Sequence, residues 1–335
     1  MRSRALIPRR RGLVAGCVLA LIAAAVAIPW LGAGQVKRGL AGLDGASPSW
    51  LALAGACFAV ALGCSAGAWR TAVTGCGGRV TPLDAGARYA VGSLVNSISP
   101  ARLGDVVRIR LFASTLAGPE RLWAAGGLFA AIGVAHWTAI GVLLAFAGAT
   151  GAVPLLPVLV VTACVSAGAA LCIVSRDVAA SRPVAHLLDG FRTFGRSPNI
   201  ASRVYGWAFA ATIARVAAAG SVGAALGVHR PLAAALVVVP ALELAGLLPL
   251  TPGNLGVASG AVAVALSTQG VGATTAVAGG LALHGVEMVI GLTVGLAGAL
   301  VLAPIRVRRL VTAIGTAGVA VTLATAVAIV QLDAL

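Results

Sequence analysis

Two copies of one short sequence pattern could bind an anion. Each copy has a hydroxyl residue, then proline, then a leucine-glycine pair two residues later, and each interrupts an apolar segment, at residues 99–104 and 251–256. A hydroxyl residue followed by proline is typical of a helix N-cap and first turn, so each copy is expected to end one helix and begin another. The free N–H groups and positive dipole at such a helix start suit a phosphate. The candidate binding residues are Asn96, Ser99, Pro100, Arg102, Gly104, Asp105, Arg108, Thr251, Pro252, Gly253, Asn254 and Gly256.

Arg102 lies within the first copy and could add a bidentate contact to phosphate oxygens. A structural role is the alternative, because Arg102, Asp105 and Arg108 are spaced three residues apart on one helical face and could neutralise one another. Both interpretations of Arg102 stay open on the sequence alone, whereas a structural role is favoured for Asp105.

Four ionisable residues lie inside otherwise apolar stretches, namely Arg215, Glu243, His284 and Glu287. Such residues are costly in apolar surroundings unless they are used, so each is a functional hypothesis. Arg215 and Glu243 could form a buried structural bridge. His284 and Glu287 are three residues apart and could share a proton, although a hydrogen-bonded packing pair is favoured. No D-D-x-x-D run, H-x-x-x-H pair or C-x-x-C pair is present, so we expect no metal, no cofactor and no enzymatic activity.

The composition places these residues in a membrane protein. The 335-residue chain is 59% hydrophobic and 10% charged, with a mean hydropathy of +1.01, which lies outside the range of a soluble domain. The net charge of +15 comes from arginine clusters between apolar runs, so nucleic acid is not expected as a partner. Only Lys37 among the 24 basic residues is a lysine, which is typical of GC-rich coding and indicates a bacterial source.

The apolar runs predict an all-α polytopic membrane protein with one transmembrane domain over residues 1–335. Seven runs are long enough to cross a membrane, at 12–31, 49–69, 122–148, 152–174, 204–226, 274–302 and 310–332. Two further segments, 83–116 and 232–269, are each split by the repeated pattern. Each of these predicts a broken, re-entrant helix hairpin that enters and leaves on the same side.

The basic residues predict the orientation of the chain. With the N-terminus in the cytoplasm, 20 of the 24 basic residues lie on the inner side, three lie outside, and Arg215 lies inside a helix. The positive-inside rule requires such a bias. The polar stretch 175–203 then becomes a cytoplasmic connector, and the C-terminus lies outside the cell membrane. Arg108 is expected near the inner leaflet, as an anchor or as a head-group contact.

The two hairpins are expected to enter from opposite faces, each between two full spans. Because the two copies of the pattern lie about half the chain apart, we interpret the halves as an inverted-topology repeat. Broken helices at matching places in two halves point to a binding site. A transporter is therefore the first functional hypothesis.

The two pattern regions also resemble a known family. Residues 96–105 and 247–257 resemble the two signature regions of the flippase-like transmembrane domain of lysylphosphatidylglycerol synthases, and the resemblance covers roughly residues 50–302. It implies a helical translocase for a modified phospholipid or a related lipid with a charged head group. Residues 258–260 replace the acidic residue that usually follows the second signature, and the usual Glu-Arg pair is missing around residues 131–136. No segment resembles the aminoacyl-transferase domain of the full synthases, so lipid synthesis is not expected.

Three function classes follow from these observations. A lipid translocase that holds a phosphate between half-helix N-termini explains the hairpins, the buried ions and the arginine-rich inner face. A transporter of a small soluble anion explains the hairpins but not the resemblance. A membrane-embedded transferase for lipid head groups would need a nucleophile or metal cluster. The translocase is the leading hypothesis, with membrane lipids as partners and a homo-oligomer or an associated lipid-modifying enzyme as further partner candidates.

Overall fold

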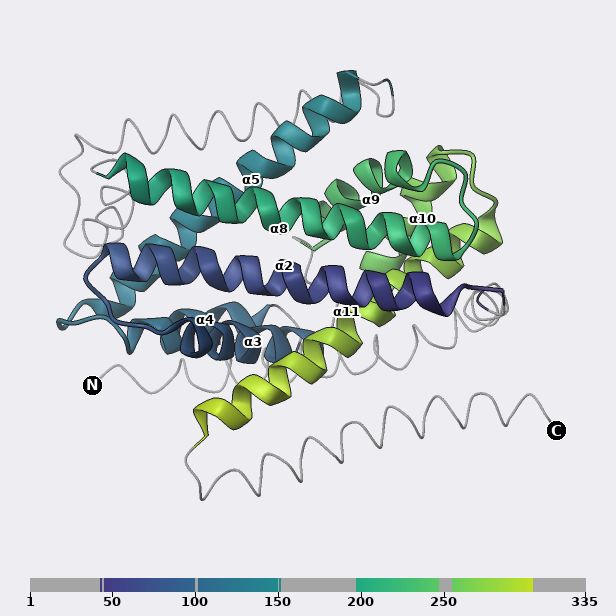
Figure 1. The fold of residues 1–335 in the computed structure, drawn as a ribbon. Coiled ribbons are helices and arrows are strands. Elements are labelled where there is room, and N and C mark those ends of the chain that lie inside the picture. The colour runs from purple at the N-terminus through teal and green to yellow at the C-terminus, as the bar shows by residue number, and fades with distance from the viewer. Residues whose placement is uncertain are drawn as a thin grey trace, which may run out of the picture.

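The computed structural model describes residues 43, 45–99, 102–149, 151, 197–246 and 255–303 of the chain. Within these ranges all eight regular elements are α-helices (Figure 1), which confirms the all-α fold class. Four of these helices are long and apolar enough to cross a membrane. The predicted spans 12–31, 152–174 and 310–332, and residues 175–196 of the predicted connector, lie outside the described residues.

The helices of the first half follow the order long, short, short, long. They are α2 (Pro48–Gly75), α3 (Pro82–Ile98), α4 (Leu103–Ala113) and α5 (Arg121–Ala149). A proline begins both α2 and α3, where its fixed φ suits the first turn. Thr81 caps α3 because its Oγ1 accepts a hydrogen bond from the backbone N–H of Asp84 at 3.2 Å. Since α2 runs on to Gly75, it extends beyond the predicted span 49–69 and includes Arg70.

The second half repeats this order with nearly the same lengths. Its helices are α8 (Pro198–Ala225), α9 (Pro231–Ala245), α10 (Leu255–Thr268) and α11 (Ala273–Leu302). Both α2 and α8 have 28 residues, and α11 has 30 residues against 29 for α5. Proline again begins the first two helices of the half. The helices α4 and α10 both begin at the leucine of the repeated pattern.

The long helices α2 and α8 also end in the same way. A glycine in the left-handed conformation follows each of them, Gly77 at φ 79° and Gly227 at φ 68°. The N–H of the next residue returns to a carbonyl of the last turn, at 3.0 Å after α2 and at 2.9 Å after α8. Glycine closes a helix in this way because it adopts a positive φ without steric cost.

These two helices pack antiparallel and form the centre of the described structure (Figure 1). The N–H of Ser47 donates to the carbonyl of Ala225 at 3.1 Å at one end, and Gly75 lies against Ile200 at the other. The first helix pair (α3 and α4) lies beside one end, and the second helix pair (α9 and α10) lies beside the opposite end.

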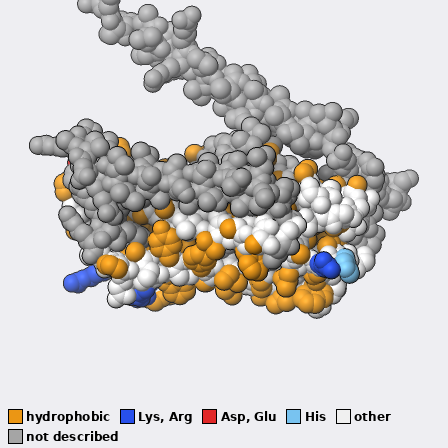
Figure 2. All heavy atoms as spheres, turned by 90° about the horizontal axis from the view of Figure 1, so that it is seen from above, with side chains coloured by type: hydrophobic (Ala, Val, Ile, Leu, Met, Phe, Trp, Pro, Cys, Tyr) orange, Lys and Arg blue, Asp and Glu red, His pale blue; other side chains and the backbone are white. Residues whose placement is uncertain are grey.

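A hydrophobic cluster holds each helix pair against α2, α5 and α8. At the first helix pair, Trp69 stacks on Phe112 with the ring centroids 4.5 Å apart. At the second, Phe58 and Ile140 pack with Val238 and Leu283. The outer surface is apolar as well, because Figure 2 shows hydrophobic side chains over the middle of the visible described face and basic side chains at its ends. This distribution supports a multi-pass membrane protein.

Glycines bring helix backbones into direct contact at three crossings. A Cβ at any of them would meet a backbone carbonyl of a neighbouring helix: Gly104 of α4 faces Gly92 of α3, Gly280 of α11 faces Ser259 of α10, and Gly298 of α11 faces Ala87 of α3. Small residues permit such close approach of membrane helices. As a result, α11 touches both helix pairs through its backbone.

Candidate functional site

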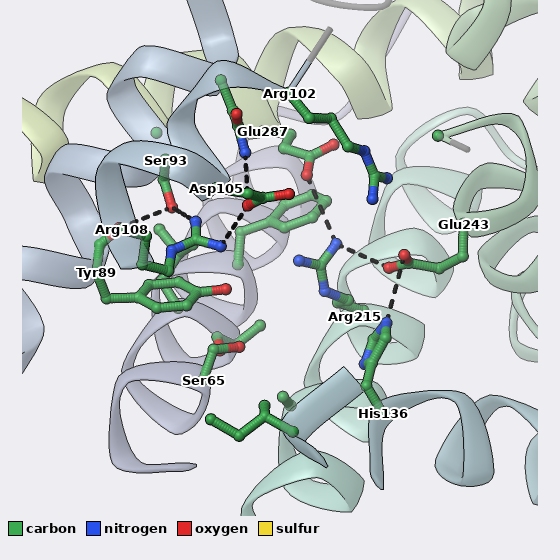
Figure 3. Close-up of a pocket in the computed structure, with 18 of the residues that line it drawn as sticks. Ser65, Tyr89, Ser93, Arg102, Asp105, Arg108, His136, Arg215, Glu243 and Glu287 are labelled. Carbon is green, nitrogen blue, oxygen red and sulfur yellow. Dashed lines mark hydrogen bonds and ion pairs between the residues drawn. The ribbon is translucent and has the colours of Figure 1, made fainter. Parts of the chain in front are cut away.

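A cavity of about 510 Å³ lies at mid-length of α2 and α8, between the two helix pairs. Helix α2 supplies the apolar side chains of Phe58 and Trp69 and the hydroxyl of Ser65 to its wall, and further polar side chains converge from six other helices or their caps (Figure 3). Nine of the predicted site residues line this cavity: Asn96, Ser99, Arg102, Asp105, Arg108, Arg215, Glu243, His284 and Glu287. Gly104 and Gly256 are described but do not line it.

The first helix break differs locally from the prediction. Ser99 does not cap the next helix, since it is the C-cap of α3, and its Oγ donates back to the carbonyl of Val95 at 2.6 Å. Helix α4 begins only at Leu103, with Arg102 as its N-cap residue at φ 53°. A non-glycine residue adopts this left-handed conformation only at a cost. Pro100 lies outside the described residues.

A tight ion pair fixes the first turns of α4 against α3. Arg108 Nη1 lies 2.7 Å from Asp105 Oδ1, and Arg108 Nη2 donates to Ser93 Oγ at 3.3 Å. The guanidinium also lies 4.0 Å from the centre of the Tyr89 ring, and Asn96 Nδ2 donates to Asp105 Oδ1 at 3.2 Å. With 7% of its surface exposed, Arg108 is part of the protein interior. This burial by Asp105 and Tyr89 contradicts the expectation of a lipid-exposed inner-leaflet anchor, whereas the alternative of a head-group contact stays a prediction, because Arg108 lines the cavity.

Arg102 has no such partner. Its side chain extends into the cavity from the start of α4 (Figure 3), and its Nη2 lies against Gly246, the C-cap residue of α9. Among the described residues, none accepts a hydrogen bond from Arg102 or forms an ion pair with it. The predicted mutual neutralisation thus includes Asp105 and Arg108 only. The Arg102 side chain therefore extends from the start of α4 in the first helix pair to the C-cap of α9 in the second.

A row of polar contacts, one from a histidine and two between arginine and glutamate, crosses the cavity from α5 to α11 (Figure 3). His136 Nε2 lies 3.3 Å from Glu243 Oε2, and Arg215 Nη1 lies 3.3 Å from Glu243 Oε1 and 3.6 Å from Glu287 Oε1. The predicted Arg215–Glu243 bridge is thus present. These separations exceed the distance of about 2.8 Å typical of a charge-assisted hydrogen bond. The contacts among His136, Glu243, Arg215 and Glu287 are therefore weaker than the ion pair between Asp105 and Arg108.

His284 does not form the packing pair that its spacing predicted. Both ring nitrogens are buried without a hydrogen-bond partner among the described residues, and 7% of the residue is exposed. The carboxylate of Glu287 is engaged by Arg215 of α8 instead. The i, i+3 spacing places both residues on one face of α11, but Glu287 pairs with Arg215 of the neighbouring helix α8.

The second copy of the repeated pattern is described only in part. Thr251, Pro252, Gly253 and Asn254 lie outside the described residues, so their predicted role stays a prediction. Gly256 is an exposed residue in the first turn of α10. The equivalent Gly104 is buried at the α3–α4 crossing.

Sequence reasoning missed the part that His136, Tyr89 and Ser65 have in the cavity wall. His136 lies on α5, within an apolar span. The signal that could have identified it is the same as for Glu243, namely an ionisable side chain within an apolar span. Tyr89 and Ser65 have no comparable signal, since both are ordinary in helices.

The described residues contain no group of three or more His, Cys, Asp or Glu side chains that could hold a metal ion. Comparison with protein families gives one match, in which the profile of the lysylphosphatidylglycerol synthase TM region covers residues 13–295. Comparison with curated proteins gives no match. The family match includes every residue that lines the cavity.

Proposed function

This chain belongs to the family of lysylphosphatidylglycerol synthase transmembrane regions, and from this premise we propose that it is a lipid translocase. Its cargo is a phospholipid or lipid-linked intermediate with a charged head group, which it moves between leaflets without chemical change. Membership of the family supports a function with membrane lipids. The cavity supports the more specific proposal of translocation.

The unpaired Arg102 is the observation on which the proposal rests. Arg102 makes no ion pair or hydrogen bond among the described residues, so its guanidinium is available in the cavity to a ligand that supplies a negative charge. The diester phosphate of a lipid does so, and its oxygens match the two-pronged guanidinium geometry. A cavity of about 510 Å³ is of the size that small ligands occupy in proteins.

The arrangement of the short helices supports the same proposal. We interpret α3–α4 and α9–α10 as re-entrant hairpins that enter from opposite faces, related by the inverted repeat that the matching helix lengths indicate. In such transporters the broken helices surround a site near the middle of the bilayer. A head group at Arg102 would contact the hairpin of one face at the N-terminus of α4 and that of the other near Gly246.

The proposed orientation can be tested at the two ends of α8. In a background without the six native cysteines, Ser197→Cys is expected to react with a membrane-impermeant maleimide only from the cytoplasmic side, and His229→Cys only from outside intact cells. Position 229 is preferable to Gly227, whose φ of 68° would strain a cysteine. Reaction of Ser197→Cys from outside would overturn the orientation.

The proposed function is tested by Arg102→Ala in liposomes that contain purified protein and a fluorescent phospholipid. Loss of one charge-assisted contact to phosphate is expected to weaken lipid binding by about 1.5 to 3 kcal/mol, or about 10- to 100-fold. Translocation of the fluorescent lipid, measured by its loss of access to an external quencher, is expected to slow in proportion at limiting lipid.

Arg230→Ala is the matched control for this experiment. Arg230 is also an arginine at a helix N-cap with a positive φ, but it does not line the cavity. It is expected to translocate lipid at the wild-type rate. Equal rates for Arg102→Ala and wild type would show that Arg102 does not contact the cargo. Uptake of inorganic phosphate with no lipid movement would favour a soluble anion as the substrate instead.

A further inference from the structure

The charges that line the cavity balance one another. Among the described residues, three arginines and three carboxylates line the cavity, and the two histidines add no charge when neutral; the charged groups are Arg102, Arg108, Arg215, Asp105, Glu243 and Glu287. Residues 247–254, which follow α9, contain no ionisable side chain that would alter this balance. A lipid with a single phosphodiester charge would therefore bring one uncompensated negative charge into a membrane-embedded cavity, where such a charge is costly.

One carboxylate is far less compensated than the other two. Asp105 has Arg108 at 2.7 Å and the Asn96 amide at 3.2 Å, and Glu243 has both Arg215 and His136 at 3.3 Å. Among the described residues, Glu287 makes one ion pair, with Arg215 at 3.6 Å, and 36% of its side chain is exposed, against 13% for Glu243. Because Glu287 lines the cavity, its carboxylate is accessible to water that enters there.

From this geometry we infer that a lipid with a monoanionic phosphodiester head group enters the cavity together with one proton, which Glu287 accepts. The inference rests on the proposed function and concerns the same site. When the phosphate approaches Arg102, the negative charge near Glu287 increases, and a proton from water bonds to a carboxylate oxygen of Glu287. Release of the lipid on the other side returns this proton to water, so charge and atoms balance in each cycle.

The surroundings of Glu287 favour it as the proton acceptor. Six helices or their caps contribute the other described ionisable side chains of the cavity: Tyr89 (α3), Arg102, Asp105 and Arg108 (α4), His136 (α5), Arg215 (α8), Glu243 (α9) and His284 (α11). The lining residues of α2 and α10 include no acidic or basic side chain. The arginines are cations at every relevant pH and accept no proton. His284 lies one turn before Glu287 with both ring nitrogens unpartnered, so it can receive a hydrogen bond from the protonated carboxyl.

This inference distinguishes two classes of lipid. A head group with an amine brings its own positive charge, so its entry leaves the balance unchanged and requires no proton. Short-chain phosphatidylglycerol and phosphatidylethanolamine differ in this respect and are suitable probes. Binding of the first is expected to take up one proton per lipid, and binding of the second is expected to take up none.

The experiment measures proton uptake during lipid binding to purified protein in detergent, by calorimetry in buffers that differ in ionisation enthalpy. The wild type is expected to take up one proton with dihexanoylphosphatidylglycerol and none with dihexanoylphosphatidylethanolamine. Glu287→Gln keeps the shape of the side chain and is expected to bind the first lipid without uptake. The control Glu120→Gln removes an exposed carboxylate outside the cavity and is expected to behave as wild type.

Each outcome supports or overturns the inference. Binding of phosphatidylglycerol to the wild type without proton uptake would overturn it and leave the proposed function intact. Uptake that persists in Glu287→Gln would overturn the assignment to Glu287. If the Gln variant does not fold, the wild-type comparison of the two lipids still decides the coupling. Failure of both lipids to bind to the wild type would instead contradict the proposed function.

Discussion

Arg215→Met is expected to lower the free energy of unfolding by about 3 to 5 kcal/mol, because it removes one partner of a buried ion pair. The side chains of Arg215 and Glu243 are 19% and 13% exposed, so the variant would leave the Glu243 carboxylate buried without the guanidinium that pairs with it. The contact with Glu287 adds less, since that carboxylate is more than a third exposed and water screens it. Denaturant unfolding in detergent, followed by circular dichroism, measures the loss.

Two further variants make this result specific. Arg203→Met removes an exposed arginine from the same helix and is expected to change stability by no more than about 0.5 kcal/mol. The double variant Arg215→Met with Glu243→Gln removes the uncompensated charge and is expected to regain more than half of the loss. If Arg215→Met is as stable as Arg203→Met, the ion pairs of Arg215 do not stabilise the fold.

Gly104→Ala is expected to lower the free energy of unfolding by about 3 kcal/mol, the upper end of the usual cost of overpacking. The added methyl group would meet the carbonyl oxygen of Gly92 and would lie 2.5 Å from Asn96 Oδ1. A backbone carbonyl cannot rotate away as a flexible side chain can, so α4 must move from α3. This movement displaces Arg102 and Asp105, and lipid translocation is expected to fall with stability.

Gly126→Ala on α5 is the matched control. This glycine is also inside a helix, but no heavy atom lies within 4 Å of the position a Cβ would take. Alanine is expected to leave stability unchanged or to raise it by up to about 1 kcal/mol, through its better helix propensity. Equal stability of the two alanine variants, measured by denaturant unfolding in detergent, would show that the α3–α4 crossing tolerates a side chain.

The helices could be predicted because their signals are local. Long apolar runs predicted the four described spans, and the repeated pattern predicted the break between α3 and α4. The second predicted break, at residues 251–254, lies outside the described residues. The same pattern misplaced the cap, since Ser99 closes α3 and Arg102 precedes α4 in a left-handed conformation. A hydroxyl-proline pair favours a helix start, but the two residues after Pro100 are not part of that signal. The start of α4 at Leu103 reflects tertiary packing instead, because Gly104 in its first turn lies against Gly92 of α3.

The site was predictable as a set of residues but not as a set of contacts. An ionisable residue in an apolar span is visible in the sequence, and this identified Arg215, Glu243 and Glu287. The partners come from four different helices, so no spacing rule could join His136 to Glu243. For the same reason the spacing of His284 and Glu287 gave the wrong pair.

The glycine crossings of α11 also constrain how the molecule can move. Gly280 and Gly298 place this helix in backbone contact with both helix pairs, and no side chain lies between that could change rotamer and let either pair slide. Between them, Gly285 has no neighbouring heavy atom within 4 Å of its Cβ position. Helix α11 therefore forms a rigid link between the two helix pairs, and it is loosely packed at Gly285. If the chain translocates lipid as proposed, a tilt of one helix pair is expected to be transmitted through α11 to the other, so that the two pairs move together.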